Sequence, residues 1–138
     1  MTQDPAVLAP VLKQLDAPEP VRRRDAVVQL RFFGLKKAPR ELVARMEDAD
    51  PEVQSWAALT LGELEDAAAV PALLAAAGDA KRGTNIRCNA IVSLGRLKSP
   101  DAASALAKLK DDPDPTVSTQ AGAAFEKLKP TTQPAPRG

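Results

Sequence analysis

The sequence predicts an all-α fold, an α-solenoid in which eight helices form four pairs that stack into a right-handed α-α superhelix. Three observations predict this fold: a two-part unit recurs four times, apolar residues follow helical spacing, and small residues are in excess. The chain has 138 residues, which is enough for one domain and too few for two. We therefore expect one repeat domain, residues 1–129, followed by a short tail.

The recurring unit has two parts. The second part reads PVRRRDAVVQLRFFG from Pro20, PEVQSWAALTLGELED from Pro51, NIRCNAIVSLGRLKSPD from Asn85 and PTVSTQAGAAFEKLKP from Pro115. The first part reads APVLKQLDA, PRELVARMED, VPALLAAAGD and PDAASALAKLKD. Self-similarity at a fixed period is the signature of a repeat architecture. We expect the repeats at about 5–33, 39–64, 68–97 and 100–128.

Each part is expected to form a helix. In the second repeat, Val53, Ala57, Leu61 and Leu64 recur at steps of three and four residues, the period of one helical face. Short turns between such segments favour antiparallel pairs. The expected helices cover roughly 5–15, 20–33, 39–47, 51–64, 68–77, 85–97, 100–110 and 115–128.

Prolines mark several of these helix starts. Four dipeptides place a capping side chain before a proline at the first helical position, where proline gives up a donor that has no partner in the helix. They are Asp4-Pro5, Asp50-Pro51, Ser99-Pro100 and Asp114-Pro115. Pro10 and Pro71 instead fall within first-part helices, and each is expected to kink its helix or to mark a late start.

The excess of small residues fits such an array. The chain contains 26 Ala and 16 Leu, against three Phe, one Trp and no Tyr. Alanine is the best helix former, and small side chains let helix axes approach closely. Gly62 and Gly95 are expected at such close helix contacts. Phe32 and Phe33 are expected to pack against the next helix pair.

The rest of the composition excludes several kinds of chemistry. The chain has no histidine and a single cysteine, Cys88. It cannot build a Ser-His-Asp or Cys-His nucleophile system, a zinc site of Cys and His ligands, or a disulfide within the chain. We expect no catalytic residue, no cofactor and no metal, and hence a protein that is not an enzyme. The N-terminal residues do not resemble a signal peptide and no run is long enough to span a membrane, so a cytoplasmic protein is expected. The richness in Ala, Pro and Arg suggests a bacterial source.

The strings VRRRDAVVQL, DPEVQSWAALTLGEL, NIRCNAIVSLGRL and VPALL resemble HEAT repeats. They look most like the short, Ala- and Gly-rich subtype named after phycobilisome lyases, whose pattern is roughly D-P-x-V-R-x-x-A-A-x-A-L-G-x-L followed by a V-P-x-L helix. The resemblance covers residues 5–128 and is strongest in the second and third repeats. The first repeat departs at Arg22, in the valine place, and the fourth at Phe125, where Leu is expected; terminal repeats often depart in this way.

The resemblance implies four HEAT-like helix pairs and, most often, a scaffold that binds proteins. Similar repeats form bilin lyase subunits, DNA glycosylases and a di-iron hydroxylase that acts on a modified lysine. The hydroxylase type uses His-Glu metal motifs, which this sequence cannot form, so it is set aside. Our first hypothesis is a non-enzymatic scaffold or adaptor that binds another protein or a peptide; the alternative is an enzyme-associated subunit like the bilin lyase components.

Charge alternates along the chain although the net charge is +1. Residues 1–45 hold nine basic and five acidic residues, residues 46–80 none and eight, residues 81–110 seven and one, and residues 111–138 three and four. The acidic middle would repel a phosphate backbone, so nucleic-acid binding is disfavoured. Three interpretations of the charges stay open: solvation of turns, orientation of a charged partner, and salt bridges between neighbouring repeats.

The second helices carry the candidate site, because in the resembling family they tend to line the concave face. Counted from Arg22, Val53, Ile86 and Val117, the seventh place holds Val28, Leu59, Val92 and Ala123. Stacking would align the first three into an apolar stripe with polar flanks, which is either a partner groove or part of the core. The candidate partner-binding residues are Arg24, Val28, Ser55, Trp56, Leu59, Cys88, Asn89, Val92, Arg96, Thr119 and Gln120.

Single residues allow further expectations. Trp56 is either a core plug or a central contact for a partner. Cys88 is expected to be a passive small residue, although neighbouring Arg87 could lower its pKa. The tail, residues 130–138, is Pro-rich and expected to be disordered, as a plain tail or a short ligand segment. The chain is expected to be a monomer or a weak homodimer.

Overall fold

The computed structural model describes residues 5–128, and within them the chain forms eight α-helices and no strand. The helices are α1 (Pro5–Gln14), α2 (Pro20–Leu30), α3 (Arg40–Ala44), α4 (Pro51–Leu64), α5 (Val70–Gly78), α6 (Thr84–Leu97), α7 (Pro100–Leu109) and α8 (Pro115–Leu128). Two short 3-10 segments, η1 (Arg45–Glu47) and η2 (Ala67–Ala69), follow α3 and precede α5. The predicted tail at 130–138 lies outside the described residues.

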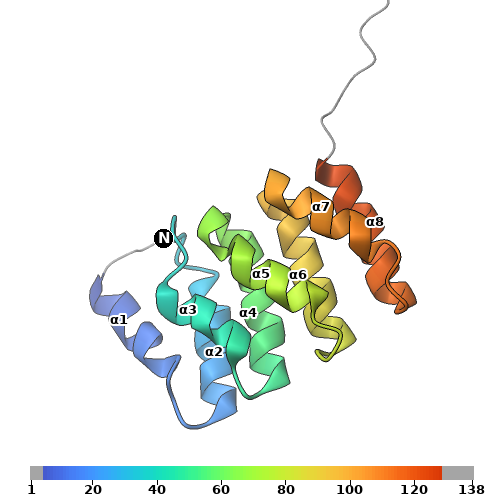
Figure 1. Ribbon diagram of the computed structural model, residues 1–138. Coiled ribbons are helices and arrows are strands. Elements are labelled where there is room, and N and C mark those ends of the chain that lie inside the picture. Colours follow the sequence, from blue (N-terminus) through green and yellow to red (C-terminus); the bar gives the residue numbers. More distant parts are fainter. Residues whose placement is uncertain (1–4, 129–138) are drawn as a thin grey trace, which may run out of the picture.

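The helices form two layers, as expected for an α-solenoid. Figure 1 shows the first helices of the pairs, α1, α3, α5 and α7, in one layer and the second helices in the other. The two most extensive contacts join neighbouring second helices, α4 with α6 and α6 with α8, and α2 also packs on α4. The second helices therefore form the continuous layer of the molecule, and the predicted fold class is confirmed.

Three helix bounds differ from expectation by more than one residue. The expected helix at 39–47 tightens into η1 after Ala44. Helix α2 ends at Leu30, and residues 31–34 form a turn that closes at Gly34, whose φ is 65°. Pro71 lies in the first turn of α5 after η2, so the late start is confirmed there. Pro10 instead lies inside α1.

The predicted caps form wherever the structure describes them. The side chains of Asp50 and Ser99 accept hydrogen bonds from the N–H groups of Glu52 and Asp101, at 2.8 and 3.2 Å. Asp114 does the same for the N–H of Thr116, at 2.9 Å. Each bond satisfies a first-turn donor that has no partner within the helix. Asp4 lies outside the described residues.

Close contact between α4, α6 and α8 explains the two predicted glycines. A Cβ placed on Gly62 would come within 2.3–2.7 Å of Ser93 side-chain and backbone atoms, and one on Gly95 within 3.2 Å of the Ala124 Cβ. Alanines occupy many of the remaining buried positions of these helices, among them Ala57, Ala58, Ala90, Ala121 and Ala124. The small residues are therefore what lets the second helices stack.

The two adjacent phenylalanines of the first repeat differ in burial. Phe33 is buried, as expected, whereas 73% of Phe32 is exposed. The expectation that both would pack against the next helix pair is therefore wrong for Phe32. Both residues lie in the turn that follows α2 and leads to Gly34, and two successive side chains of such a turn do not point the same way.

The second place of each second helix holds a polar side chain that returns to the first helix of its own pair. Arg23, Gln54, Arg87 and Ser118 each donate a hydrogen bond to a backbone carbonyl at or just beyond the end of that helix. The accepting carbonyls belong to Ala17, Asp48, Ala77 and Lys110. These bonds satisfy C-terminal carbonyls that have no partner within their helix.

Ion pairs connect successive repeats and account for much of the charge alternation. Arg23 pairs with Asp48 and Arg31 with Glu63. Further along the chain, Arg82 pairs with Glu47 and Arg87 with Asp112. The interpretation of the alternating charges as salt bridges between neighbouring repeats is thereby confirmed for these four pairs. None of the helices formed by residues 5–128 is long and apolar enough to cross a membrane.

Candidate functional site

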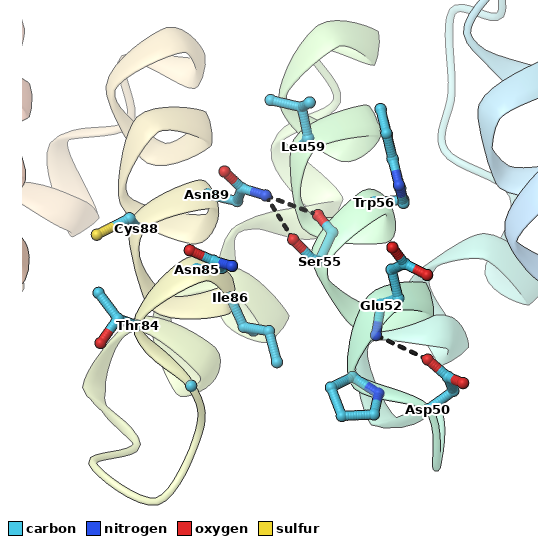
Figure 2. A pocket seen from close by; sticks show the side chains of 12 residues that line it. Asp50, Glu52, Ser55, Trp56, Leu59, Thr84, Asn85, Ile86, Cys88 and Asn89 are labelled. Carbon is cyan, nitrogen blue, oxygen red and sulfur yellow. Dashed lines mark hydrogen bonds between the residues drawn. The ribbon is translucent and has the colours of Figure 1, made fainter.

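A pocket of about 840 Å³ opens between α4 and α6 (Figure 2). Both helices contribute their N-terminal halves to it. The α4 side is formed by Asp50, Pro51, Glu52, Ser55, Trp56 and Leu59. The α6 side is formed by Gly83, Thr84, Asn85, Ile86, Cys88 and Asn89. Residues four apart on a helix share a face, which is why Glu52, Trp56 and the pair Asn85 and Asn89 line the same space.

A hydrogen-bonded bridge divides this pocket. The side-chain amide of Asn89 donates to the Oγ of Ser55 at 2.8 Å and to its backbone carbonyl at 3.1 Å. Figure 2 shows these bonds crossing from α6 to α4, with Leu59 on one side of them and Asp50 on the other. The pocket thus has an apolar half beside Leu59 and an acidic half beside Asp50 and Glu52.

A second pocket, of about 480 Å³, lies between α2 and α4. It is lined by Arg24, Asp25, Val28, Gln29, Glu52 and Trp56. Glu52 and Trp56 line both pockets. The two pockets together form a groove across α2, α4 and α6, and Glu52 and Trp56 stand on the ridge between its two parts. We call this groove the second-helix groove.

Trp56 is half-buried on that ridge and packs against the hydrophobic core. The guanidinium of Arg31 lies 5.7 Å from the centre of its ring, within the range of a cation–π contact. Glu63 accepts two hydrogen bonds from Arg31, at 2.5 and 2.8 Å, and so fixes the guanidinium in place. The indole is therefore held rigidly and still presents part of its surface to the groove.

The apolar stripe is not part of the core. Val28, Leu59 and Val92 are each half-buried, and Ala123 is exposed, whereas the core residues Leu30, Leu61 and Leu94 are fully buried. The core interpretation of Val28, Leu59 and Val92 is therefore wrong. Their partial exposure leaves apolar surface on the layer of second helices.

The structure brings together seven of the eleven candidate residues. Ser55, Trp56, Leu59, Cys88 and Asn89 line the α4/α6 pocket. Arg24 and Val28 line the α2/α4 pocket. Val92, Arg96, Thr119 and Gln120 line neither pocket. Arg96 lies instead near Glu63, at 3.5 Å between Nη1 and Oε2.

Several pocket residues were missed from the sequence, chiefly Asp50, Glu52 and Asn85. A signal for two of them was present: Glu52 lies four residues before Trp56, and Asn85 four residues before Asn89. The stripe continues one helical turn toward the N-terminus. Extending the candidate site by one helical turn before Trp56 and Asn89 would have included Glu52 and Asn85.

Cys88 differs from expectation in its electrostatics. Burial, and next the charge of Asp114, raise the pKa of the Cys88 thiol, and the opposing effect of Arg87 is smaller. Arg87 is turned away to Asp112 and the carbonyl of Ala77. In Figure 2 the Cys88 sulfur points away from Ser55 and Asn89. Arg87 does lower this pKa, as expected, but burial and Asp114 outweigh it, so the pKa of the thiol is raised overall. The thiol lies at the margin of the pocket.

Within residues 5–128, no group of three or more His, Cys, Asp and Glu side chains is arranged to hold a metal ion. Two carboxylates with little exposed side chain, 1% for Asp48 and 11% for Asp112, are occupied by local bonds. Asp48 accepts from Arg23, Arg45 and the N–H of Asp50. Asp112 accepts from Arg87 and the N–H of Asp114.

The model of a protein family described as HEAT repeats matches residues 39–126. Among curated proteins, deoxyhypusine hydroxylase of Gallus gallus is 29% identical over 116 residues, which are 83% of this chain and 39% of the relative. The chain thus spans less than half the length of that relative. The similarity includes most of the described helices.

Solved structures resemble the fold closely. Human deoxyhypusine hydroxylase in complex with glycerol superposes with a TM-score of 0.77 at 23% identity, over 88% of this chain and 43% of that one. The complex of CpcE and CpcF of phycocyanin lyase from Nostoc sp. PCC7120 gives a TM-score of 0.72 at 24% identity, over 94% and 54%. An engineered protein gives 0.68 at 19% identity, over 91% and 63%. At these identities the structures establish the shared fold.

These comparisons overturn one expectation from composition. The absence of histidine led to the prediction that the chain is not an enzyme and to the exclusion of hydroxylases. Yet the relatives it matches are an enzyme, deoxyhypusine hydroxylase, and a phycocyanin lyase. The prediction of a non-enzymatic protein is therefore contradicted, because composition excludes particular catalytic groups and not relationship to enzymes.

Proposed function

Since the chain belongs to the family of HEAT-repeat proteins, we propose that it is a protein-binding module that holds a segment of a partner protein in the second-helix groove. This groove is the feature of the described residues that best supports the proposal. It combines half-buried apolar side chains, a rigid indole and hydrogen-bonding amides. Binding sites of this kind are concave and mostly apolar, with a few placed polar groups.

The single observation that carries the proposal is the position of Trp56. It lines both parts of the groove, and its ring packs beside the guanidinium of Arg31, 5.7 Å from the ring centre. Tryptophan is enriched among the few residues that contribute most of the energy of an interface. Because the side chain is already ordered before binding, a partner that covers it loses less conformational entropy.

The groove is of a suitable size for a segment rather than a whole domain. Its two parts have volumes of about 840 and 480 Å³, and each falls in the range of pockets that enclose a few side chains. Val28 and Leu59 offer apolar surface in one part each. A peptide that crosses the ridge at Trp56 would therefore place side chains in both.

The arginines that could form a basic surface are largely engaged. Arg23, Arg31 and Arg87 have side-chain exposures of 13, 27 and 5% and each forms a two-point contact with a carboxylate. Arginines in such contacts are not available to neutralise phosphates. This supports a protein partner over a nucleic acid.

Selection of peptides on the purified full chain tests the proposal. Random linear peptides displayed on phage are selected on the immobilised chain, and individual peptides are then titrated. We expect selected peptides to bind the Leu59→Ala variant about tenfold more weakly, because the substitution removes apolar contact area while leaving a good helix former in α4. Circular dichroism verifies that the variant remains folded.

Leu74→Ala is the matched control, because Leu74 is also half-buried but lies on α5, in the layer of first helices. The affinity of the Leu74→Ala variant for the selected peptides should equal that of the unaltered chain. If no peptide is enriched, or if Leu59→Ala and Leu74→Ala weaken binding equally, the second-helix groove is not the binding surface.

A second candidate function is that of a subunit working beside an enzyme, favoured by the resemblance to the CpcE and CpcF complex. The segment held in the groove would then belong to an enzyme subunit or its protein substrate. Absorbance spectra of the purified chain with an added bilin test the lyase form of this candidate. A shifted and intensified absorbance band supports it, and a spectrum equal to that of the free bilin contradicts it.

A further inference from the structure

We propose that the partner segment presents a lysine or arginine side chain to the acidic half of the α4/α6 pocket, and an apolar side chain to the half beside Leu59. This inference rests on the proposed function and specifies the chemistry of its partner. It follows from the charge of the pocket, from the bridge that divides it, and from the distance between its halves.

The α4/α6 pocket is negatively charged. Asp50 and Glu52 line it, and no arginine or lysine is among its lining residues. Arg87, at the start of α6, is bound to Asp112 and to the carbonyl of Ala77. Arg82, just before α6, is bound to Glu47 and to the carbonyl of Met46. These two arginines on the α6 side are therefore directed elsewhere.

Both carboxylates keep capacity to accept a further donor. Asp50 uses Oδ1 to cap the N–H of Glu52, which leaves its second oxygen for a ligand. The Glu52 side chain is 66% exposed, and its contact with Arg24 is 3.6 Å long. An ion pair that is so exposed to solvent contributes little energy, so Arg24 does not prevent Glu52 from binding another cation. An ammonium or guanidinium group can therefore pair with either carboxylate.

The Ser55–Asn89 bridge separates this acidic half from the apolar half. Ile86 and Asn85 line the acidic half from the α6 side, and Figure 2 shows both below the bridge, facing the α4 side. The apolar edge of Ile86 suits the methylene stem of a lysine or arginine, whose charged end would then reach Asp50 and Glu52. Above the bridge, Leu59 and Trp56 suit an apolar side chain.

The spacing of the two halves sets the spacing of the two partner residues. Glu52 and Leu59 are seven positions apart on α4, which is about 10 Å along the helix axis. An extended chain covers that distance in about three residues. The partner segment should therefore carry a basic residue and an apolar residue about three positions apart.

The double variant Asp50→Asn with Glu52→Gln tests the charge without disturbing the fold, because asparagine caps a helix as well as aspartate does. The control variant, Glu41→Gln with Asp101→Asn, makes the same change of charge on exposed residues of α3 and α7. Random peptides on phage are selected on the unaltered chain and on both variants. Selected peptides are then titrated at low and high salt.

We expect peptides selected on the unaltered chain and on the control to be enriched in the basic and apolar pair at that spacing. Their affinity should fall about tenfold in the double variant and at high salt, as for two exposed charge contacts. Peptides without basic residues, or with unchanged affinity for the double variant, overturn this inference. If such peptides still bind Leu59→Ala weakly, the proposed function stands; if no peptide is enriched, both fall.

Discussion

The guanidinium of Arg87 on α6 lies against the carboxylate of Asp112, in the turn before α8, with 2.6 Å between Nη2 and Oδ2. Arg23 on α2 makes the equivalent contact with Asp48, in the turn before α4, at 2.8 Å. Each pair joins a second helix to the following repeat. Because the two partners come from segments of opposite net charge, the alternation in the sequence corresponds to the joints of the solenoid.

Removing Arg87 should destabilise the whole chain. Its side chain is 5% exposed, and Arg87→Met keeps an apolar body while leaving Asp112 and the Ala77 carbonyl without their donor. Leaving the buried Ala77 carbonyl without a partner costs about 1–3 kcal/mol. Urea unfolding followed by circular dichroism measures the free energy. Arg22→Met is the control, since Arg22 is 66% exposed, and equal losses in the two variants would contradict the assigned role of Arg87.

Gly62→Ala should destabilise the contact between α4 and α6. The added Cβ would meet the backbone Cα of Ser93 at 2.7 Å, so the helices must move apart, at a cost of about 1–3 kcal/mol. Gly122→Ala is the matched control because no atom lies within 4 Å of its added Cβ. That variant should gain about 0.5–1 kcal/mol from helix propensity. Thermal unfolding of both variants checks the opposite signs, and a stabilised Gly62→Ala would refute the close packing.

Two helix ends place ordinary residues in the left-handed region. Glu65 after α4 has φ 60° and Lys98 after α6 has φ 54°, conformations that favour glycine. Glu65→Gly and Lys98→Gly should each stabilise the chain by up to about 1 kcal/mol. Lys110, with φ −61° at the end of α7, is the control, and Lys110→Gly should give no gain. The urea concentration at the midpoint of unfolding measures the stability of each variant. A loss of stability in both Glu65→Gly and Lys98→Gly contradicts the prediction.

Acid should unfold the protein through its repeat joints. The hydrogen bond from Arg87 holds the pKa of Asp112 below its ordinary 3.8. Burial would raise the pKa of Asp48, but the hydrogen bond and charge of Arg23 lower it overall. A carboxyl whose folded pKa is depressed contributes stability above its unfolded pKa and loses that contribution as the pH falls through the folded pKa.

Stability should therefore be nearly constant between about pH 7 and 5 and should fall below about pH 4. Urea unfolding at several pH values measures this dependence. In Asp112→Asn the decline below pH 4 should be shallower, because one of the contributing carboxyls is absent. A decline equally steep in the variant and in the unaltered chain would show that Asp112 does not contribute.

Local rules explain why the helices could be predicted. Asp50 before Pro51 specifies a helix start through steric and capping effects that need no distant partner. The repeat then relates each helix to its equivalents, so that Gly62 and Gly95 could be assigned to close contacts. The same comparison applies to Phe32, which follows Leu30 by two residues as Glu63 follows Leu61 and Arg96 follows Leu94, so the charged residues at this place indicated an exposed position.

The site was predictable only in part. The stripe through Val28 and Leu59 follows from helical period, but its burial depends on how far apart the helices stand. The bridge from Asn89 to Ser55 joins residues 34 positions apart, and helix spacing alone decides whether an amide can reach across. Glu52 entered the sequence analysis only as one of the acidic residues of 46–80, although its place four residues before Trp56 puts it in the groove.

Binding of a peptide in the second-helix groove is tested most directly through Trp56, the chain's single tryptophan. A peptide selected on the full chain is titrated while the tryptophan emission is recorded. If the peptide lies in the second-helix groove, the Trp56 emission changes saturably and shifts to shorter wavelength, because the half-exposed indole becomes covered. The affinity obtained from this titration should equal the affinity measured by an independent method. Binding of the peptide with no change in Trp56 emission would contradict the second-helix groove as the binding surface.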